Sequence, residues 1–160
     1  MKLLRTIRFD SSDDRVFDVA AGPDEWAVSG AFAFAHLAPE EVTGKVKQAF
    51  ANGFLGVQSF GRSTFATVSE ADRSACDEIA FRLAKHFVES YGAPGIEAAL
   101  PAAREEVDFI LSLCRDVPIN TVFTVRRFFD KEGQIKEELR TIKPPTGEPL
   151  HARIWTVEPE

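Results

Sequence analysis

Residues 119–129 read Ile119-Asn-Thr-Val-Phe-Thr-Val-Arg-Arg-Phe-Phe129, and the fold is organised around this stretch. β-Branched and aromatic residues dominate it, and Ile119, Phe123, Val125 and Phe129 fall on one face at a period of two. Residues of these types favour strands, and a period of two places their side chains on one side of a sheet. The stretch therefore predicts a β-strand.

The next residues, Asp130-Lys-Glu-Gly133, are typical of a tight turn. Asp favours the first position of such a turn, and Gly133 supplies the left-handed conformation that closes a hairpin with a bulge. The return strand then covers residues 134–142. Placing Asp130 opposite Gln134 pairs Phe129 with Ile135, Arg127 with Glu137, Val125 with Leu139 and Phe123 with Thr141 on one face, and Phe128 with Lys136, Arg126 with Glu138, Thr124 with Arg140 and Val122 with Ile142 on the other.

This register sets two arginines opposite two glutamates, a match that a slip of one residue would destroy. Arg127 and Glu137 share their face with Val125 and Leu139. If that face is covered, the pair is either a desolvated ion pair or an anion-gripping arginine held by its glutamate. If the face is only rimmed by core residues, the pair contributes little.

Composition describes an ordinary globular chain. With 160 residues, 44% hydrophobic and 28% charged, it is long enough for one well-packed domain and short for two, so we expect a single domain over residues 1–160. The sequence holds 14 Phe against one Tyr and two Trp. Because Phe has no polar tip, we expect most of these rings to be buried and some to line an apolar groove.

Charge and hydropathy exclude several partners. The formal net charge of -6, with basic residues scattered along the chain, makes nucleic acid and anionic membranes poor partners. Residues 1–10 lack a long apolar core, and no window approaches an apolar span of about 18 residues. We therefore expect a soluble cytoplasmic protein, in which Cys76 and Cys114 are reduced, buried residues without a metal or redox role.

The rest of the chain alternates between strand and helix patterns. The expected fold class is α+β, a mainly antiparallel sheet of about six strands with three helices packed against it. The expected strands cover 2–9, 15–19, 26–35, 57–68 (interrupted at 61–64) and 150–157 besides the hairpin, and the expected helices cover 39–52, 71–91 and a segment that starts at Pro101.

Few residues form a recognisable chemical motif. Gly61-Arg62-Ser63 suggests an anion site, but without a following helix N-terminus a β-bulge is the simpler interpretation. Glu105 and Asp108 are neighbours on one expected helix and are candidates for acid–base work, against the simpler reading of an acidic outer face. No spacing fits a metal site, and no cofactor is expected.

Five runs of sequence carry a resemblance that extends over nearly the whole chain. The chain resembles a small bacterial family of unknown function, and this resemblance implies no activity, cofactor or catalytic residue. The runs are Asp13–Ala20, Gln48–Gly56, Ser59–Phe65, Thr124–Arg127 and Pro144–Arg153.

Three functions remain open. The leading hypothesis is a non-catalytic binding or accessory protein, whose ligand-binding candidates are Arg127, Glu137, Arg62 and His151. The second is a small-molecule enzyme of hydrolase or isomerase type that uses Glu105 or Asp108 with His151 or Arg62, which requires distant segments to meet in one cleft. The third is a homodimer joined through an exposed sheet face that carries phenylalanines.

Overall fold

A computed structural model describes residues 1–143 and 156–159. Its described strands form one sheet in the order β4-β3-β2-β1-β5-β6-β7-β8, and every neighbouring pair is antiparallel. The α+β class is confirmed, with more strands than the expected six. The strands are β1 (Lys2–Ile7), β2 (Trp26–Val28), β3 (Phe54–Gly56), β4 (Arg62–Ser63), β5 (Phe65–Glu70), β6 (Val122–Phe129), β7 (Ile135–Lys143) and β8 (Thr156–Pro159).

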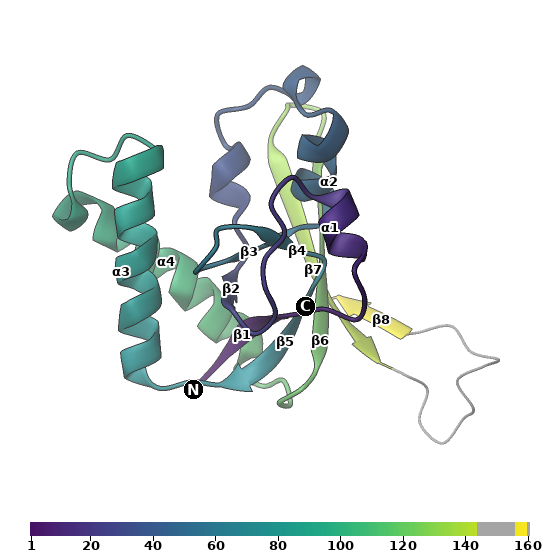
Figure 1. The fold of residues 1–160 in the computed structure, drawn as a ribbon, viewed down its shortest axis with the longest axis vertical. Helices are drawn as coiled ribbons and strands as arrows, with labels where there is room; N and C mark the ends of the chain where they lie inside the picture. Colours follow the sequence, from purple (N-terminus) through teal and green to yellow (C-terminus); the bar gives the residue numbers. More distant parts are fainter. Residues whose placement is uncertain (144–155, 160) are drawn as a thin grey trace.

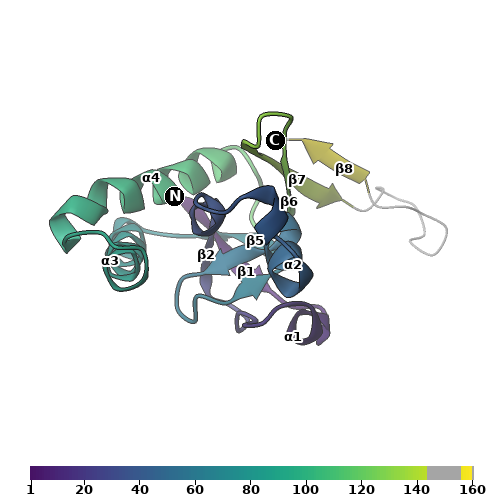
Figure 2. The same cartoon turned by 90° about the horizontal axis from the view of Figure 1, so that it is seen from above.

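Two groups of helices flank the sheet (Figures 1 and 2). The long helices α3 and α4 lie against each other at one end of the molecule, and α4 contacts β1 and β2. The short helices α1 and α2 lie at the other end, where α2 packs on β6. The helices are α1 (Ser12–Val16), α2 (Gly44–Asn52), α3 (Arg73–Ser90) and α4 (Ile96–Cys114), with 3-10 turns η1 (Ala31–Phe34) and η2 (Pro39–Glu41).

The hairpin of β6 and β7 has the register that its sequence predicts. All eight expected pairs are present, among them Arg127 opposite Glu137. Gly133 has a φ of 79°, and the Asp130 carboxylate accepts the backbone N–H groups of Glu132 and Gln134, both at 2.9 Å. The turn is therefore closed by the two residues whose types predict it.

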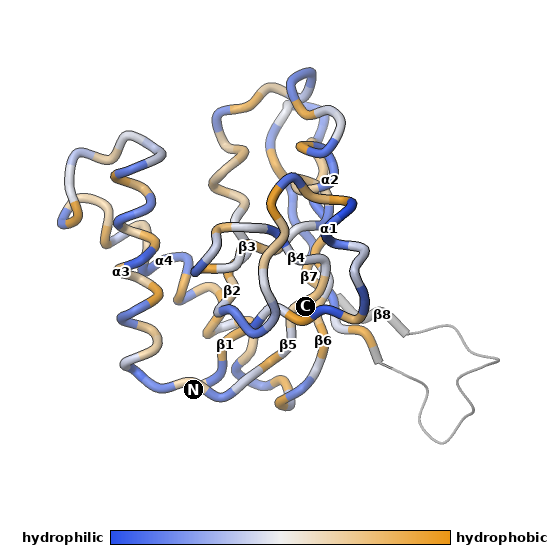
Figure 3. Tube along the Cα trace, in the orientation of Figure 1, coloured by the Kyte–Doolittle hydropathy of each residue, from blue (hydrophilic) through white to orange (hydrophobic). Residues whose placement is uncertain are grey.

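The main core lies between the sheet and the long helices. Along α3 and α4, apolar residues recur at helical spacing, and hydrophobic and hydrophilic segments alternate along α3 in Figure 3. Most of the phenylalanines are buried or half-buried, as expected, and so are both cysteines. The phenylalanines that remain exposed are Phe9, Phe81, Phe109 and Phe128.

The strand expected over residues 15–19 is wrong, because Ser12–Val16 forms α1. Asp13 and Asp14 occupy the first turn of this helix, where acidic side chains interact favourably with the helix dipole. Asp13 is buried, and its carboxylate accepts the Thr64 hydroxyl at 2.7 Å. The alternating pattern of this segment is thus overridden by a tertiary contact with the residue that precedes β5.

The strand expected over residues 26–35 ends early, at Val28. Gly30 has a φ of 78°, which breaks the extended conformation, and the following residues form the 3-10 turn η1. The apparent alternation of large residues with alanine beyond Gly30 therefore reflects a tight turn.

Three other boundaries also differ from expectation. The helix expected over 39–52 is divided at Gly44, which has a φ of 59°, and the helix expected from Pro101 begins at Ile96. Within 57–68, residues 57–60 form a turn that joins β3 to β4. Of the strand expected over 150–157, only residues 156 and 157 are described, so the candidate His151 lies outside the described residues.

Candidate functional site

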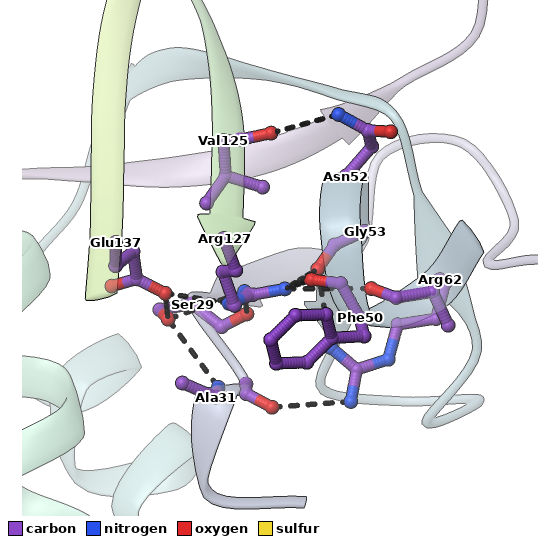
Figure 4. Close-up of polar contacts among 11 residues, drawn as sticks. Ser29, Ala31, Phe50, Asn52, Gly53, Arg62, Val125, Arg127 and Glu137 are labelled. Carbon is purple, nitrogen blue, oxygen red and sulfur yellow. Dashed lines mark hydrogen bonds and ion pairs between the residues drawn. The ribbon is translucent and has the colours of Figure 1, made fainter. Parts of the chain in front are cut away.

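The Arg127 side chain, near the end of β6, forms polar contacts with several segments of the chain (Figure 4). Its side chain is completely buried, and its Nε donates to Glu137 Oε2 at 2.7 Å. Nη1 donates to the carbonyls of Phe50 and Gly53, both at 2.9 Å. Nη2 donates to the carbonyl and the hydroxyl of Ser29. A guanidinium carries five N–H groups, and each of these has an acceptor within the chain.

Two of the carbonyls that Arg127 reaches, those of Phe50 and Gly53, lie at the end of α2. A helix leaves its last carbonyls without intrahelical partners and places partial negative charge there. Phe50 lies in the last turn of α2 and Gly53 immediately follows it. Arg127 therefore caps this helix with a full positive charge and fixes α2 to β6.

Glu137 and Ser29 both contact the Arg127 guanidinium and are also hydrogen-bonded to each other. The Ser29 hydroxyl donates to Glu137 Oε2 at 2.5 Å, so this oxygen accepts from both Ser29 and Arg127. The Glu137 side chain is 18% exposed, whereas that of Arg127 is fully buried. Of the two interpretations left open by the register, the geometry is that of a desolvated ion pair.

Arg62 lies next to Arg127 and shares an acceptor with it. The Gly53 carbonyl accepts Nη1 of Arg62 at 3.1 Å as well as Nη1 of Arg127, and Nη2 of Arg62 donates to the Gly30 carbonyl at 3.1 Å. The Phe34 ring lies 4.8 Å from the Arg62 guanidinium carbon. Burial, reinforced by the charge of Arg127, lowers the pKa of Arg62 to about 9, so the group stays cationic at neutral pH.

Glu106 is the member of this region that the sequence did not reveal. It lies on α4, and burial, with the charge of Glu137 as the second cause, raises its pKa to about 6. The charge of Arg127 and the backbone of Gly30 act in the opposite direction and lower the pKa of Glu106. The signal in the sequence was its position three residues after Ala103 and four before Ile110. Both of these residues are buried, so this spacing places Glu106 on the buried side of the helix. Arg62, Arg127, Glu137 and Glu106 are called the ionic cluster below.

The raised pKa of Glu106 makes stability depend on pH. Folding favours the protonated carboxyl, so the free energy of unfolding falls as pH rises from about 4.5 to about 6. Glu106→Gln is therefore expected to raise the free energy of unfolding by about 1–2 kcal/mol near pH 8 and to change it little near pH 4.5. Urea unfolding at both pH values checks this, with the exposed neighbour Glu105→Gln as control. A Glu106→Gln variant no more stable than wild type near pH 8 contradicts it.

The candidate carboxylates Glu105 and Asp108 do not join the ionic cluster. Both are exposed on α4, while Arg62 is buried among the carbonyls of Gly30 and Gly53. The structure therefore does not bring Glu105 or Asp108 together with Arg62. Among residues 1–143 and 156–159, no three His, Cys, Asp or Glu side chains lie close enough to hold a metal ion.

A second buried carboxylate, Glu25, organises the turn between β3 and β4. Its Oε1 accepts the backbone N–H groups of Gln58 and Ser59 at 3.1 and 2.8 Å, and its Oε2 accepts that of Gly22 at 2.6 Å. The Ser59 hydroxyl contacts both oxygens and accepts the N–H of Gly61. This turn is therefore fixed from inside the molecule.

The fixed turn presents Phe60 in an unusual conformation. Phe60 has a φ of 56°, a left-handed conformation that costs a residue with a side chain roughly 1–2 kcal/mol. Its ring lies parallel to the imidazole of His86, with centroids 3.8 Å apart and an interplanar angle of 4°. Strained residues of this kind point to a role for the side chain that is held there.

Among the described residues, two of the surface pockets are large enough for a small ligand. One, of about 600 Å³, lies where Arg5 stacks on Trp26 at 3.6 Å, close to the start of α3. The other, of about 430 Å³, is lined by Phe60, His86 and the exposed Phe81, and is called the aromatic pocket. Both volumes fall in the range of small-molecule sites.

Comparison with known proteins identifies a family but no activity. A search of characterised proteins found no similar sequence, and a search of solved structures found no similar fold. A family model described as a family of unknown function (DUF6505) matches residues 1–154. The chain belongs to this family, DUF6505, as the resemblance in its sequence indicated.

Proposed function

We propose that this protein is a non-catalytic binding protein of the bacterial cytoplasm, in which the ionic cluster supports the fold and a ligand binds at the surface. The saturation of Arg127 carries the proposal, because all five of its N–H groups donate to acceptors within the chain. A ligand held by Arg127 would have to replace a helix cap or an ion pair. The surface pockets require no such exchange.

The outer surface is consistent with this role. No helix in the described part of the chain is long and apolar enough to span a membrane. The net charge of -6 opposes binding to nucleic acid, and the two surface pockets carry aromatic side chains suited to small molecules.

A thermal-shift screen of metabolites followed by mass spectrometry tests the proposal. We expect a ligand that raises Tm and that is recovered chemically unchanged after long incubation with an equal amount of protein. Glu137→Gln should lower the Tm of the free protein and leave the ligand-induced increase intact. Conversion of the ligand contradicts a non-catalytic role. Loss of the increase in Glu137→Gln would instead place the ligand at Arg127 and Glu137, the earlier candidates.

One observation favours a second candidate, an enzyme that moves a proton. The pKa of Glu106 is raised to about 6 beside Glu137, and a carboxyl tuned in this way can act as a general acid or base near neutral pH. In that case Glu106→Gln would abolish conversion of a bound metabolite without abolishing its binding. A homodimer joined through the half-exposed Phe128 on the outer face of the hairpin is a further proposal, and sedimentation that finds only monomer contradicts it.

A further inference from the structure

The aromatic pocket has features that a solvent-filled surface depression does not require. Phe60 reaches it from the turn before β4, while His86 and Phe81 reach it from α3. Phe81 is 54% exposed, although its ring is apolar. The pocket thus joins two segments distant in sequence and leaves aromatic surface open to water, which favours a ligand that covers it.

The conformation of Phe60 is the main argument. At a φ of 56°, glycine would meet the needs of the backbone without strain, and asparagine nearly so. The turn already contains Gly61 at the adjacent position, where an added Cβ would lie 2.6 Å from the Ala20 carbonyl carbon. Close packing therefore explains the glycine at 61, whereas the phenylalanine at 60 is present for its ring, which packs against the main core and stacks on His86 beside the pocket.

Glu25 holds this arrangement in place before any ligand arrives. Glu25 is 6% exposed, and its carboxylate accepts two consecutive backbone N–H groups, those of Gln58 and Ser59. The Phe60 amide then donates to the Gly56 carbonyl at 3.1 Å. Binding to a rigid turn costs little ordering entropy, so the Phe60 ring is preorganised for stacking.

The charges around the pocket define the kind of ligand. Burial lowers the pKa of His86 below its ordinary value, with Arg62 acting in the same direction against Glu89, so the imidazole is uncharged at neutral pH. Arg82 pairs with Glu78 at 3.3 Å. Lys85 and Glu89 also line the pocket and form no ion pair within the described residues. The aromatic rings are thus bordered by charged side chains, among which Lys85 and Glu89 offer a donor and an acceptor that no ion pair occupies.

We propose that the aromatic pocket binds a flat, uncharged aromatic molecule that carries a polar group at its edge. The ring of the ligand stacks in the pocket formed by Phe60, His86 and Phe81, and its polar edge meets Lys85 or Glu89. This proposal rests on the proposed binding function. It specifies the site at which binding occurs and the chemical class of the ligand.

A matched pair of probes tests the site in the full-length protein. 2-Naphthol and its saturated analogue decahydro-2-naphthol share a skeleton and a hydroxyl group but differ in flatness and aromaticity. Titration followed by carbon–proton NMR of the side chains, with the His86 ring reporting on the aromatic pocket and Arg5 and Trp26 on the other pocket, should show saturable binding of 2-naphthol at His86. Binding of the saturated analogue should be roughly tenfold weaker. Phe60→Gly should weaken 2-naphthol roughly tenfold, and Phe109→Ala, an exposed phenylalanine on α4, should not change it.

Two variants of the pocket residues separate a loss of binding from a loss of folding. Glycine suits the φ of Phe60, so Phe60→Gly should fold, and Phe81→Ala provides a second test from α3. Equal binding of the two probes, or unchanged affinity in both variants, overturns the aromatic site. Shifts centred on Arg5 and Trp26 overturn it too, yet leave the binding function standing. Conversion of a bound metabolite contradicts the non-catalytic function and leaves the site untouched.

Discussion

Replacing Arg127 with methionine is expected to lower the free energy of unfolding by about 3–5 kcal/mol. The substitution leaves the partly buried Glu137 carboxylate without its cation and removes the donors to the buried carbonyls of Phe50 and Gly53. Unpaired buried groups of this kind cost their full desolvation energy. Because domains of this size are stable by only about 5–15 kcal/mol, the loss is a large part of the stability of the fold.

Urea unfolding of Arg127→Met, compared with Arg126→Met, checks this expectation. Arg126 is the next residue along β6, lies on the opposite face, has a 70% exposed side chain and faces Glu138 at 4.0 Å. Its removal should change the free energy of unfolding by less than about 1 kcal/mol. Similar losses in the two variants would mean that Arg127 is not the structural centre of this region.

Gly30→Ala is expected to be the second most damaging change, with a loss of about 2–5 kcal/mol. Gly30 has a φ of 78°, and an added Cβ would lie 2.6 Å from both Arg62 Nη1 and Leu55 Cβ. The backbone strain and the overlap add, and the overlap moves Arg62 away from the carbonyls it binds. Gly30 is thus one of the places where the ionic cluster packs closely against the main chain.

Gly44→Ala is a matched control for that variant. Gly44 also has a left-handed φ, of 59°, but an added Cβ would meet nothing within 4 Å. Only the strain applies, so the expected loss is about 1 kcal/mol, partly offset by the stiffer unfolded chain. Thermal and urea unfolding of the two variants separate strain from overlap. Equal losses would show that the space around Gly30 is less tightly filled than described.

The hairpin was predictable because its information is local. Turn residues at Asp130 and Gly133 fix the reversal, and cross-strand pairs such as Arg127 with Glu137 fix the register. Segments whose structure depends on distant contacts were not predictable in the same way. Residues 12–16 become a helix whose Asp13 bonds to Thr64, and the strand from Trp26 ends where Gly30 turns toward Arg62. Neither partner is close in sequence.

The candidate site was also predictable only where its contacts are local in sequence. The pairing of Arg127 with Glu137 followed from the hairpin register, whereas the acceptors on Ser29 and at the end of α2 come from segments 74 to 98 residues away. Glu106 was missed because the exposed Glu105 and Asp108 were its more obvious neighbours. The left-handed conformation of Phe60 has no signal in a single sequence, since Phe rarely adopts it.

Proton exchange at the Arg127 guanidinium is the most direct test of the account. Nitrogen–proton NMR of the wild-type protein, with the signals assigned through the side-chain carbons of Arg127, should show separate, slowly exchanging resonances for all five guanidinium N–H groups. These resonances should stay in place when a ligand binds. A single averaged signal in fast exchange with water, or signals that move with the ligand, would contradict a guanidinium wholly committed to the fold.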